Sequence, residues 1–112
     1  MSIFMKATLR INPYRAEEFL KVLRENLIPM MEDRGWRLHA CFVGRFGPIN
    51  PMVVTDIWEM EDMAHVERVL KDFSYRSDPR YLAPQSTLES AVLQEEVEFM
   101  ELKAGRLETC YP

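Results

Sequence analysis

The order in which hydrophobic periodicity changes along the chain limits its fold more than any single motif does. Residues 3–11 alternate large apolar with mostly polar side chains, which is the two-residue period of a β-strand with two different faces. Residues 14–33 then place Leu20, Leu23 and Leu27 at steps of three and four, which is the period of a helix with one buried stripe. Two alternating stretches, further helical stretches and a last alternating stretch follow. This order predicts a β-α-β-β-α-β unit.

Capping signals mark where the helices begin and end. Asn12-Pro13 and Asp78-Pro79 each place a capping side chain before a proline, which suits the first turn of a helix. Pro29 cannot donate the hydrogen bond that a helix needs at its position. We therefore expect a kinked or irregular last turn before Gly35 ends the first helix.

The middle of the chain predicts a hairpin and a second helix. Residues 36–46 and 52–60 both alternate, and the turn formers between residues 47 and 51 separate them. One expected face of residues 36–46 carries Trp36, Leu38, Ala40, Phe42 and Phe46, and the other carries Arg37, His39, Cys41, Val43 and Arg45. Asp62 can cap the second helix, a less regular helical stretch follows Pro79, and residues 96–102 alternate as a last strand.

These elements predict an α+β fold, a ferredoxin-like βαββαβ sandwich with an extra helical segment. We expect one domain over residues 1–102 and a tail without periodicity over residues 103–112. In this topology the helices cover one face of the sheet and leave the other bare. The bare face is expected to mix Phe4, Thr8, Cys41 and Val43 with Lys6, Arg10, His39 and Arg45. Such a face suits neither water nor a sealed core, so we expect it to pair with a second copy as a dimeric α/β barrel.

Charge and composition exclude several partners. The chain has 112 residues and a formal net charge of -4, so no long-range field favours nucleic acid. Its longest uninterrupted apolar run is only residues 40–43, far below the roughly 20 residues that span a bilayer. No membrane association is expected. We expect a cytoplasmic protein of one domain.

The sequence predicts neither a cofactor nor a metal site. The glycine-rich, P-loop, zinc-protease and serine-hydrolase motifs do not occur. Cys41, Cys110, His39 and His65 are four possible ligands, but none has the short paired spacing that zinc sites use. In a reducing compartment we expect no structural disulfide between the two cysteines.

Three titratable residues are the candidate catalytic groups. Asp56 lies in a predicted central strand, so its carboxylate is expected to be buried. It is either an ion-pair partner of Arg10, Lys6 or Arg45, or a general base whose pKa is raised by burial. His65, near the start of the second helix, is either a surface or capping residue or a proton-transfer group or haem ligand. As a residue near a helix end, it is expected to tolerate replacement by glutamine without loss of stability.

His39 lies on the mixed face of the second predicted strand. It is either a hydrogen-bonding residue of the dimer interface or a catalytic base.

The candidate substrate-binding residues are Trp58, Arg45, Tyr75, Tyr81 and Trp36. The aromatic residues either wall an apolar cavity for a small organic ligand or fill the core. The eight methionines of the chain would suit an adaptable pocket, although methionine also fills irregular gaps in cores.

Several short motifs in the same order resemble a known family. They are Asn26-Leu27-Ile28-Pro29, the stretch from Gly44 to Asn50, Ile57-Trp58-Glu59, Met63-Ala64-His65 and Asp78-Pro79-Arg80-Tyr81. Between about residues 3 and 102 the chain resembles NIPSNAP-type proteins of the dimeric α/β-barrel superfamily. It departs from them at Val66, where relatives often carry arginine, and at the extra Pro51. The resemblance implies a homodimer with a cavity in each protomer between sheet and helices, and relatives that include cofactor-free oxygenases, isomerases, dehydratases, haem proteins and binders.

Two functions of different class follow from these observations. The first is a cofactor-independent enzyme that performs proton-transfer or oxygenase-type chemistry on an aromatic or enolisable metabolite. The second is a non-catalytic module that binds a ligand or a protein partner. Haem-dependent activity through His65 or His39 is a third possibility. The fold alone does not choose among them.

Overall fold

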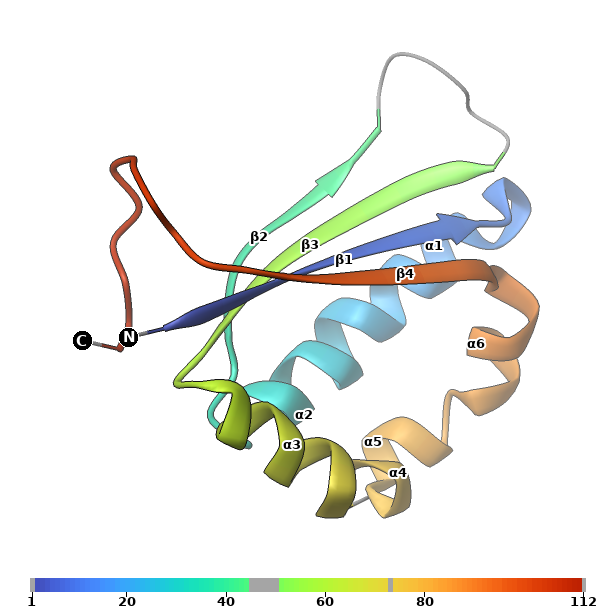
Figure 1. Cartoon of the computed structure of the whole chain (residues 1–112). Helices are drawn as coiled ribbons and strands as arrows, with labels where there is room; N and C mark the ends of the chain where they lie inside the picture. The colour runs from blue at the N-terminus through green and yellow to red at the C-terminus, as the bar shows by residue number, and fades with distance from the viewer. Residues whose placement is uncertain (1, 45–50, 73, 112) are drawn as a thin grey trace.

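The computed structural model describes residues 2–44, 51–72 and 74–111, without the side chains of residues 72–75 (Figure 1). Its elements are β1 (Ile3–Ile11), the 3-10 helix η1 (Pro13–Arg15), α1 (Ala16–Val22), the π-helix η2 (Leu23–Leu27), α2 (Ile28–Glu32), β2 (Arg37–Val43), β3 (Met52–Met60), α3 (Met63–Asp72), α4 (Ser74–Ser77), α5 (Pro79–Leu82), α6 (Gln85–Ala91) and β4 (Val92–Met100). No helix within these described ranges is long and apolar enough to span a membrane.

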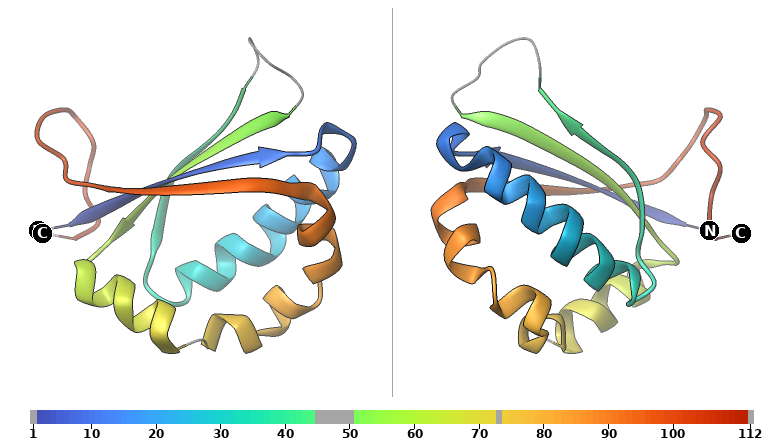
Figure 2. Two further views of the ribbon diagram at one scale, coloured as in Figure 1. Left: turned by 45° about the vertical axis from the view of Figure 1, so that its right-hand side comes forward. Right: turned by 180° about the vertical axis from the view of Figure 1, so that it is seen from behind.

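The four strands form one antiparallel sheet in the order β2-β3-β1-β4. β1 and β3 are therefore central, and β2 and β4 are the edges. All the helices lie on one side of the sheet (Figure 2). We call the side that the helices cover the inner face and the other side the outer face. This arrangement confirms the predicted ferredoxin-like fold, including the extra helical segment, which the structure divides into α5 and α6.

The core lies between the inner face and the helices. From β1, Met5, Leu9 and Ile11 turn inward and are at most 9% exposed. Phe19 and Leu23 cover them from the first helical stretch. The two-residue period of residues 3–11 therefore marks a real difference between the two faces, because burial of the apolar set is what holds the register in place.

The first helical stretch begins as predicted but becomes irregular earlier than predicted. Asn12 Oδ1 accepts a hydrogen bond from the Tyr14 N–H at 3.0 Å, and Pro13 occupies the first turn. The irregular turn is η2, which precedes Pro29 instead of following it. Proline disturbs the helix on its N-terminal side, because it cannot donate to the carbonyl four residues earlier and its ring crowds that carbonyl.

Gly35 ends this helix in a conformation that only glycine adopts easily. Its φ is 90°, and its N–H donates to the Glu32 carbonyl at 3.0 Å while the Trp36 N–H donates to the Met31 carbonyl at 3.2 Å. This pair of bonds is the Schellman motif. A Cβ at Gly35 would lie 3.1 Å from the ring of His65. Both the backbone angle and the close packing therefore require glycine here.

The predicted faces of β2 are right up to His39 and wrong from Ala40 onward. Arg37 pairs with Glu59 and Leu38 with Trp58, but the next pair is Ala40 with Ile57, so the register shifts by one residue at His39. Ala40 and Phe42 consequently lie on the outer face, whereas Cys41 and Val43 share the inner face with their β3 partners Asp56 and Val54. A bulge adds one residue to one strand and reverses the alternation after it. Arg45 and the predicted turn over residues 47–50 lie outside the described residues.

The last strand begins earlier than its sequence pattern predicts. β4 covers Val92–Met100, whereas the alternating pattern predicted a strand over residues 96–102. Before it, the capping signal is confirmed, because Asp78 Oδ1 accepts from the Arg80 N–H at 2.9 Å. Glutamates obscure the strand pattern in the sequence. The strand tolerates them because β4 is an edge strand with most of its side chains exposed. Beyond it, the tail turns back and brings the two termini side by side (Figure 1).

Trp58→Ala should destabilise the protein by about 3–5 kcal/mol, the usual cost of removing a large buried aromatic side chain. Trp58 is 5% exposed on central strand β3 and packs edge-on against Trp36 with ring centroids 6.2 Å apart. Chemical denaturation measures the change. Tyr14→Ala is the matched control, because Tyr14 is 89% exposed and its loss should change stability by less than about 0.5 kcal/mol. Equal effects of the two variants would contradict the packing described here.

Candidate functional site

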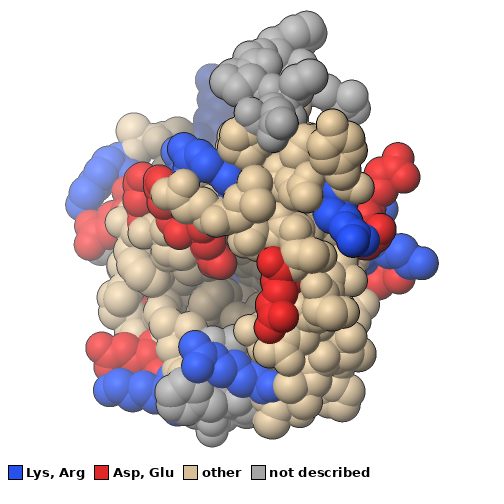
Figure 3. Space-filling model, turned by 90° about the vertical axis from the view of Figure 1, so that its right-hand side faces the viewer, with Lys and Arg blue, Asp and Glu red and all other residues tan. Residues whose placement is uncertain are grey.

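A cavity of about 590 Å³ lies between the inner face and the helices. Its lining residues are Met5, Ala7, Leu9, Phe19, Leu23, Leu27, Met30, Met31, Trp36, Asp56, Trp58, Arg76, Tyr81, Gln85, Leu88, Glu89, Val92 and Glu95. Most of them are apolar, and three are methionines. On the side that Figure 3 shows, the molecule is hollowed, with acidic and basic side chains around the hollow. A cavity of this size and character suits a small organic molecule.

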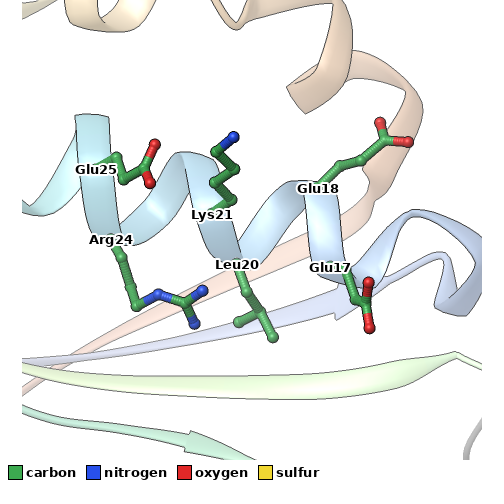
Figure 4. A pocket seen from close by; sticks show the side chains of 6 residues that line it. All are labelled: Glu17, Glu18, Leu20, Lys21, Arg24 and Glu25. Carbon is green, nitrogen blue, oxygen red and sulfur yellow. The ribbon is translucent and has the colours of Figure 1, made fainter.

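A second hollow, of about 600 Å³, lies along α1 and η2 but has no features of a binding site. Its residues are Glu17, Glu18, Leu20, Lys21, Arg24 and Glu25. All six project from one helical stretch, and they point in different directions instead of converging (Figure 4). We regard it as a solvated helix surface.

Asp56 is the most unusual polar residue of the cavity. It lies in the middle of β3, directly between Ala7 of β1 and Cys41 of β2, and is 3% exposed. Its Oδ1 has no hydrogen-bond partner among the described residues. Burial raises its pKa above the ordinary value, and hydrogen bonds from the Cys41 and Trp58 side chains offset this only in part.

The predicted ion pair of Asp56 is not found with either described candidate. Lys6 pairs in register with Ile57, and Arg10 forms an ion pair with Glu96 at 3.1 Å, so both lie on the outer face. The third candidate, Arg45, lies outside the described residues. Asp56 in turn raises the pKa of the neighbouring Cys41 thiol, which burial and this carboxylate together bring to about 12. Cys41 is therefore a protonated thiol at neutral pH.

Glu95 is a second carboxyl group at the same cavity, and sequence reasoning missed it. It lines the cavity from edge strand β4, where its side chain remains accessible to solvent. Burial of the Glu95 carboxyl group raises its pKa, and the charge of Asp56 raises it further. A usable signal was present, because Glu95 lies in phase with Val97 and Phe99, the apolar residues of the strand.

The predicted aromatic residues are partly brought together. Trp36, Trp58 and Tyr81 all line the cavity, and Trp36 Nε1 is buried without a hydrogen-bond partner among the described residues. The side chain of Tyr75 lies outside the described part of the chain. Arg76, which the sequence did not single out, also lines the cavity. Met30 and Met31 line it too, as an adaptable pocket would require, whereas Met63 is 41% exposed.

His65 lies away from the cavity and links the first turn of α3 to the turn that follows α2. It is 7% exposed, so it is buried and not at the surface. Its Nε2 lies 2.8 Å from the Arg34 carbonyl, and its Nδ1 accepts from the Glu61 N–H at 3.2 Å. The ring is therefore the neutral tautomer with the proton on Nε2. With both ring nitrogens bonded, the geometry favours the capping role over proton transfer or haem ligation.

His39 lies on the outer face, opposite the cavity. Its Nε2 is 2.6 Å from Oε1 of Glu59, whose side chain is fully buried. Glu59 also accepts hydrogen bonds from the N–H groups of Cys110 and Tyr111 and from the Ser2 hydroxyl. Burial alone would raise the pKa of Glu59, but these bonds outweigh it and lower that pKa to about 2. Together with Cys110, these two side chains form a group that could hold a metal ion.

The comparison with known families follows the same segments of the chain. The NIPSNAP family model matches residues 6–104. The chain belongs to the NIPSNAP family. Val66, where the resemblance to relatives breaks, is 1% exposed in the core, so an arginine there would need a different local packing.

Solved structures share the fold of this NIPSNAP chain at low sequence identity. A NIPSNAP family protein from Agrobacterium tumefaciens superposes with a TM-score of 0.75 at 20% identity, covering 92% of this chain and 94% of the other. A NIPSNAP-like domain protein from Burkholderia xenovorans gives 0.76 at 17% identity, covering 96% and 90%. A putative antibiotic biosynthesis monooxygenase from Bacteroides thetaiotaomicron gives 0.63 at 18%, covering 96% and 95%. No significant match is found among curated proteins.

His65→Gln should lower the free energy of unfolding by about 1–3 kcal/mol, because glutamine cannot keep both ring-nitrogen hydrogen bonds in the same buried place. This result would reverse the tolerance expected from the sequence. Urea denaturation measures it. Arg68→Gln, an exposed change on the same helix, is the control and should have almost no effect. A His65→Gln protein as stable as the control would show that the two hydrogen bonds do not contribute to the free energy of unfolding.

Proposed function

We propose that this NIPSNAP protein acts on a small organic molecule in the cavity, without a cofactor, and that Asp56 is the general base. The observation that carries the proposal is a buried carboxyl group without an ion pair among the described residues, set in the lining of an apolar cavity. A protein that needed only stability would be better served by a neutral side chain there, because burying an uncompensated charge is costly. Perturbed carboxyl groups of this kind concentrate at functional sites.

The raised pKa of Asp56 suits proton abstraction. A base removes protons more effectively when its pKa lies closer to the working pH, provided that it stays largely ionised. Glu95 is a second carboxyl group at the same cavity, and burial together with the charge of Asp56 raises its pKa. Glu95 lies at the accessible side of the cavity, where it can pass a proton to solvent.

The lining favours a flat substrate that is aromatic or enolisable. Tryptophan, leucine and methionine side chains provide the apolar contacts. A hydroxyl group of the substrate can donate to Asp56 Oδ1 or accept from Trp36 Nε1–H, the two buried atoms without described partners. Asp56 would take a proton from a phenolic hydroxyl or from carbon beside a carbonyl, which leaves a phenolate or an enolate. Return of the proton to another carbon gives an isomerisation, and reaction of the anion with dioxygen gives the oxygenase form.

A non-catalytic binding module is the second candidate, and the same pair of atoms favours it. A ligand with one hydroxyl group could satisfy Asp56 Oδ1 and Trp36 Nε1–H without any bond being broken. Binding alone would then explain why the cavity retains polar atoms. The two candidates differ in one respect: only the enzyme needs the charge on Asp56 to move a proton.

We further propose that the protein works as a homodimer that pairs outer faces. Phe42 is 60% exposed there, and Ile57 and Val53 are only partly buried. The same face carries the Arg10–Glu96 ion pair, so it mixes apolar and charged groups, although Phe42 lies there and the expected Cys41 and Val43 do not. A second copy would cover these apolar side chains and the open strand edges.

Asp56→Asn should reduce turnover about 10²-fold or more while ligand binding is kept, because the amide is nearly the same shape but cannot take the proton. Compounds that bind can be found by thermal shift among phenols and enolisable carbonyls. Turnover is then measured by NMR as exchange of the substrate's acidic carbon-bound hydrogen with D2O. Glu98→Gln is the control, because that carboxyl lies on the outer face. If Asp56→Asn exchanges at the wild-type rate, Asp56 is not the base, and the binding module becomes the leading proposal.

The same variant should be as stable as the wild type, or more stable, at neutral pH. Asp56 has a higher pKa in the folded than in the unfolded chain, so the folded state holds more protons between the two values. Its contribution to stability therefore grows as the pH falls, and at neutral pH the charged form opposes folding. Melting temperatures at pH 7 compare the two proteins. A clear loss of stability in Asp56→Asn would mean that the carboxylate has a stabilising partner.

Light scattering at micromolar concentration should give about twice the chain mass of 13.2 kDa. Phe42→Glu places a charge in the proposed interface and should shift the protein toward the monomer. Thr87→Glu on α6, away from the outer face, is the control. A monomeric wild-type protein would exclude the proposed dimeric barrel, although each chain would still contain its cavity.

A further inference from the structure

We propose that His39, Glu59 and Cys110 form a Zn²⁺ site that fastens the C-terminal tail to the sheet. The metal-binding atoms of these three side chains all lie within 4.8 Å of one another. They are an imidazole nitrogen, a carboxylate oxygen and a thiol sulfur, which are the three kinds of ligand that proteins use for zinc. The site lies on the outer face, so it is separate from the cavity.

Neighbouring strands β2 and β3 supply the first two ligands. His39 lies at the bulge in β2, with its side chain on the outer face beside Glu59 of β3. The ring of Phe4 packs against His39 with centroids 5.5 Å apart and limits how the imidazole turns. Nε2 of His39 and Oε1 of Glu59 are 2.6 Å apart. A metal ion would enter between these atoms, with a small outward movement of the ring.

The tail supplies the third ligand, the Cys110 sulfur, and a backbone hydrogen bond positions it. The Cys110 N–H donates to Glu59 Oε1 at 2.8 Å, which holds the cysteine above the carboxylate. Oε2 of Glu59 accepts from the Tyr111 N–H and from the Ser2 hydroxyl. Such hydrogen bonds orient a metal-binding carboxylate and leave its other oxygen toward the ion. A water molecule would complete four-coordination.

The ligand set selects zinc over the hard cations. Mg²⁺ and Ca²⁺ prefer oxygen ligands throughout, whereas zinc accepts nitrogen, oxygen and sulfur together. One ionised carboxylate and one thiolate would balance the two charges of Zn²⁺. Glu59 is fully buried and the His39 side chain is 13% exposed, so the site is shielded from water on the sheet side. The cysteine loses its proton on binding.

Hydrogen bonding alone is the competing explanation for the same contacts. Glu59 already fastens the tail through two backbone N–H groups, and neither needs the Cys110 side chain. The two explanations differ at one atom. If hydrogen bonds are sufficient, the Cys110 thiol is one more hydrogen-bond partner of Glu59 and keeps its proton; if zinc binds, the sulfur is a thiolate ligand.

Titration of the full chain with Zn²⁺ by calorimetry, and with Co²⁺ by absorbance, tests the proposal. We expect one Zn²⁺ per chain and a Co²⁺–thiolate absorption band. Cys110→Ser should abolish the band and weaken Zn²⁺ binding at least about 10-fold, and His39→Gln should weaken it as well. Cys41→Ser is the matched control, because the other cysteine faces the inner side of the sheet, and it should bind both metals as the wild type does.

Two results would overturn the proposal. One is wild-type protein that binds no stoichiometric Zn²⁺ at micromolar concentration. The other is a Cys110→Ser protein with wild-type affinity, which would leave hydrogen bonding as the whole explanation. Cys110 is exposed in the tail, so its serine variant should fold even if His39→Gln does not, and circular dichroism checks this. Neither result depends on the reaction proposed for the cavity.

Discussion

Central strand β3 carries two buried carboxyl groups on opposite faces, and their surroundings shift the two pKa values in opposite directions. Asp56 faces the cavity with one oxygen that has no hydrogen-bond partner in the described part of the chain, and burial raises its pKa. Glu59, three residues later, accepts hydrogen bonds from four groups, and its pKa is lowered to about 2. The same chemical group is therefore a candidate for reaction on one face and a structural anchor on the other. The odd spacing between them along a strand is what separates the two roles.

The cavity exists because the sheet is covered unevenly. The first helical stretch packs closely on β1 through Phe19 and Leu23, whereas the inner side of edge strand β4 stays open. Glu95 can therefore lie at the cavity and still reach solvent. The fold is shared with a NIPSNAP-like domain protein and with a putative antibiotic biosynthesis monooxygenase, so the fold permits chemistry without specifying it. The specific proposal rests on Asp56 and on the atoms around it.

Sequence patterns predicted the strands and helices well, because each was signalled by local periodicity and capping. Asn12, Gly35 and Asp78 act where their residue types suggested. The faces of β2 after His39 were wrong because a bulge there leaves no local signal in an alternating stretch. Glu95 was missed because an edge strand tolerates glutamates that resemble a solvated surface.

The ligand group on the outer face was missed for a different reason. His39, Glu59 and Cys110 come from three distant segments, and only the return of the tail brings them together. Zinc sites are recognised in sequences by short paired spacings, which these residues lack. Contacts set by strand pairing and by a folded-back tail are properties of the tertiary structure, so no local pattern could have shown them. The hydrogen bonds of His65 belong to the same class.

The central claim is that the carboxyl group of Asp56 is buried at the cavity without a compensating charge among the residues that the structure describes. NMR titration of the Asp56 side-chain carboxyl carbon in the ligand-free protein measures this directly, with Asp56→Asn used to assign its signal. We predict a pKa clearly above the ordinary value of an aspartate, since burial is the largest influence on it. A pKa at or below the ordinary value would show that a cation or strong hydrogen bonds stabilise the charge, and that result would contradict the account of the site.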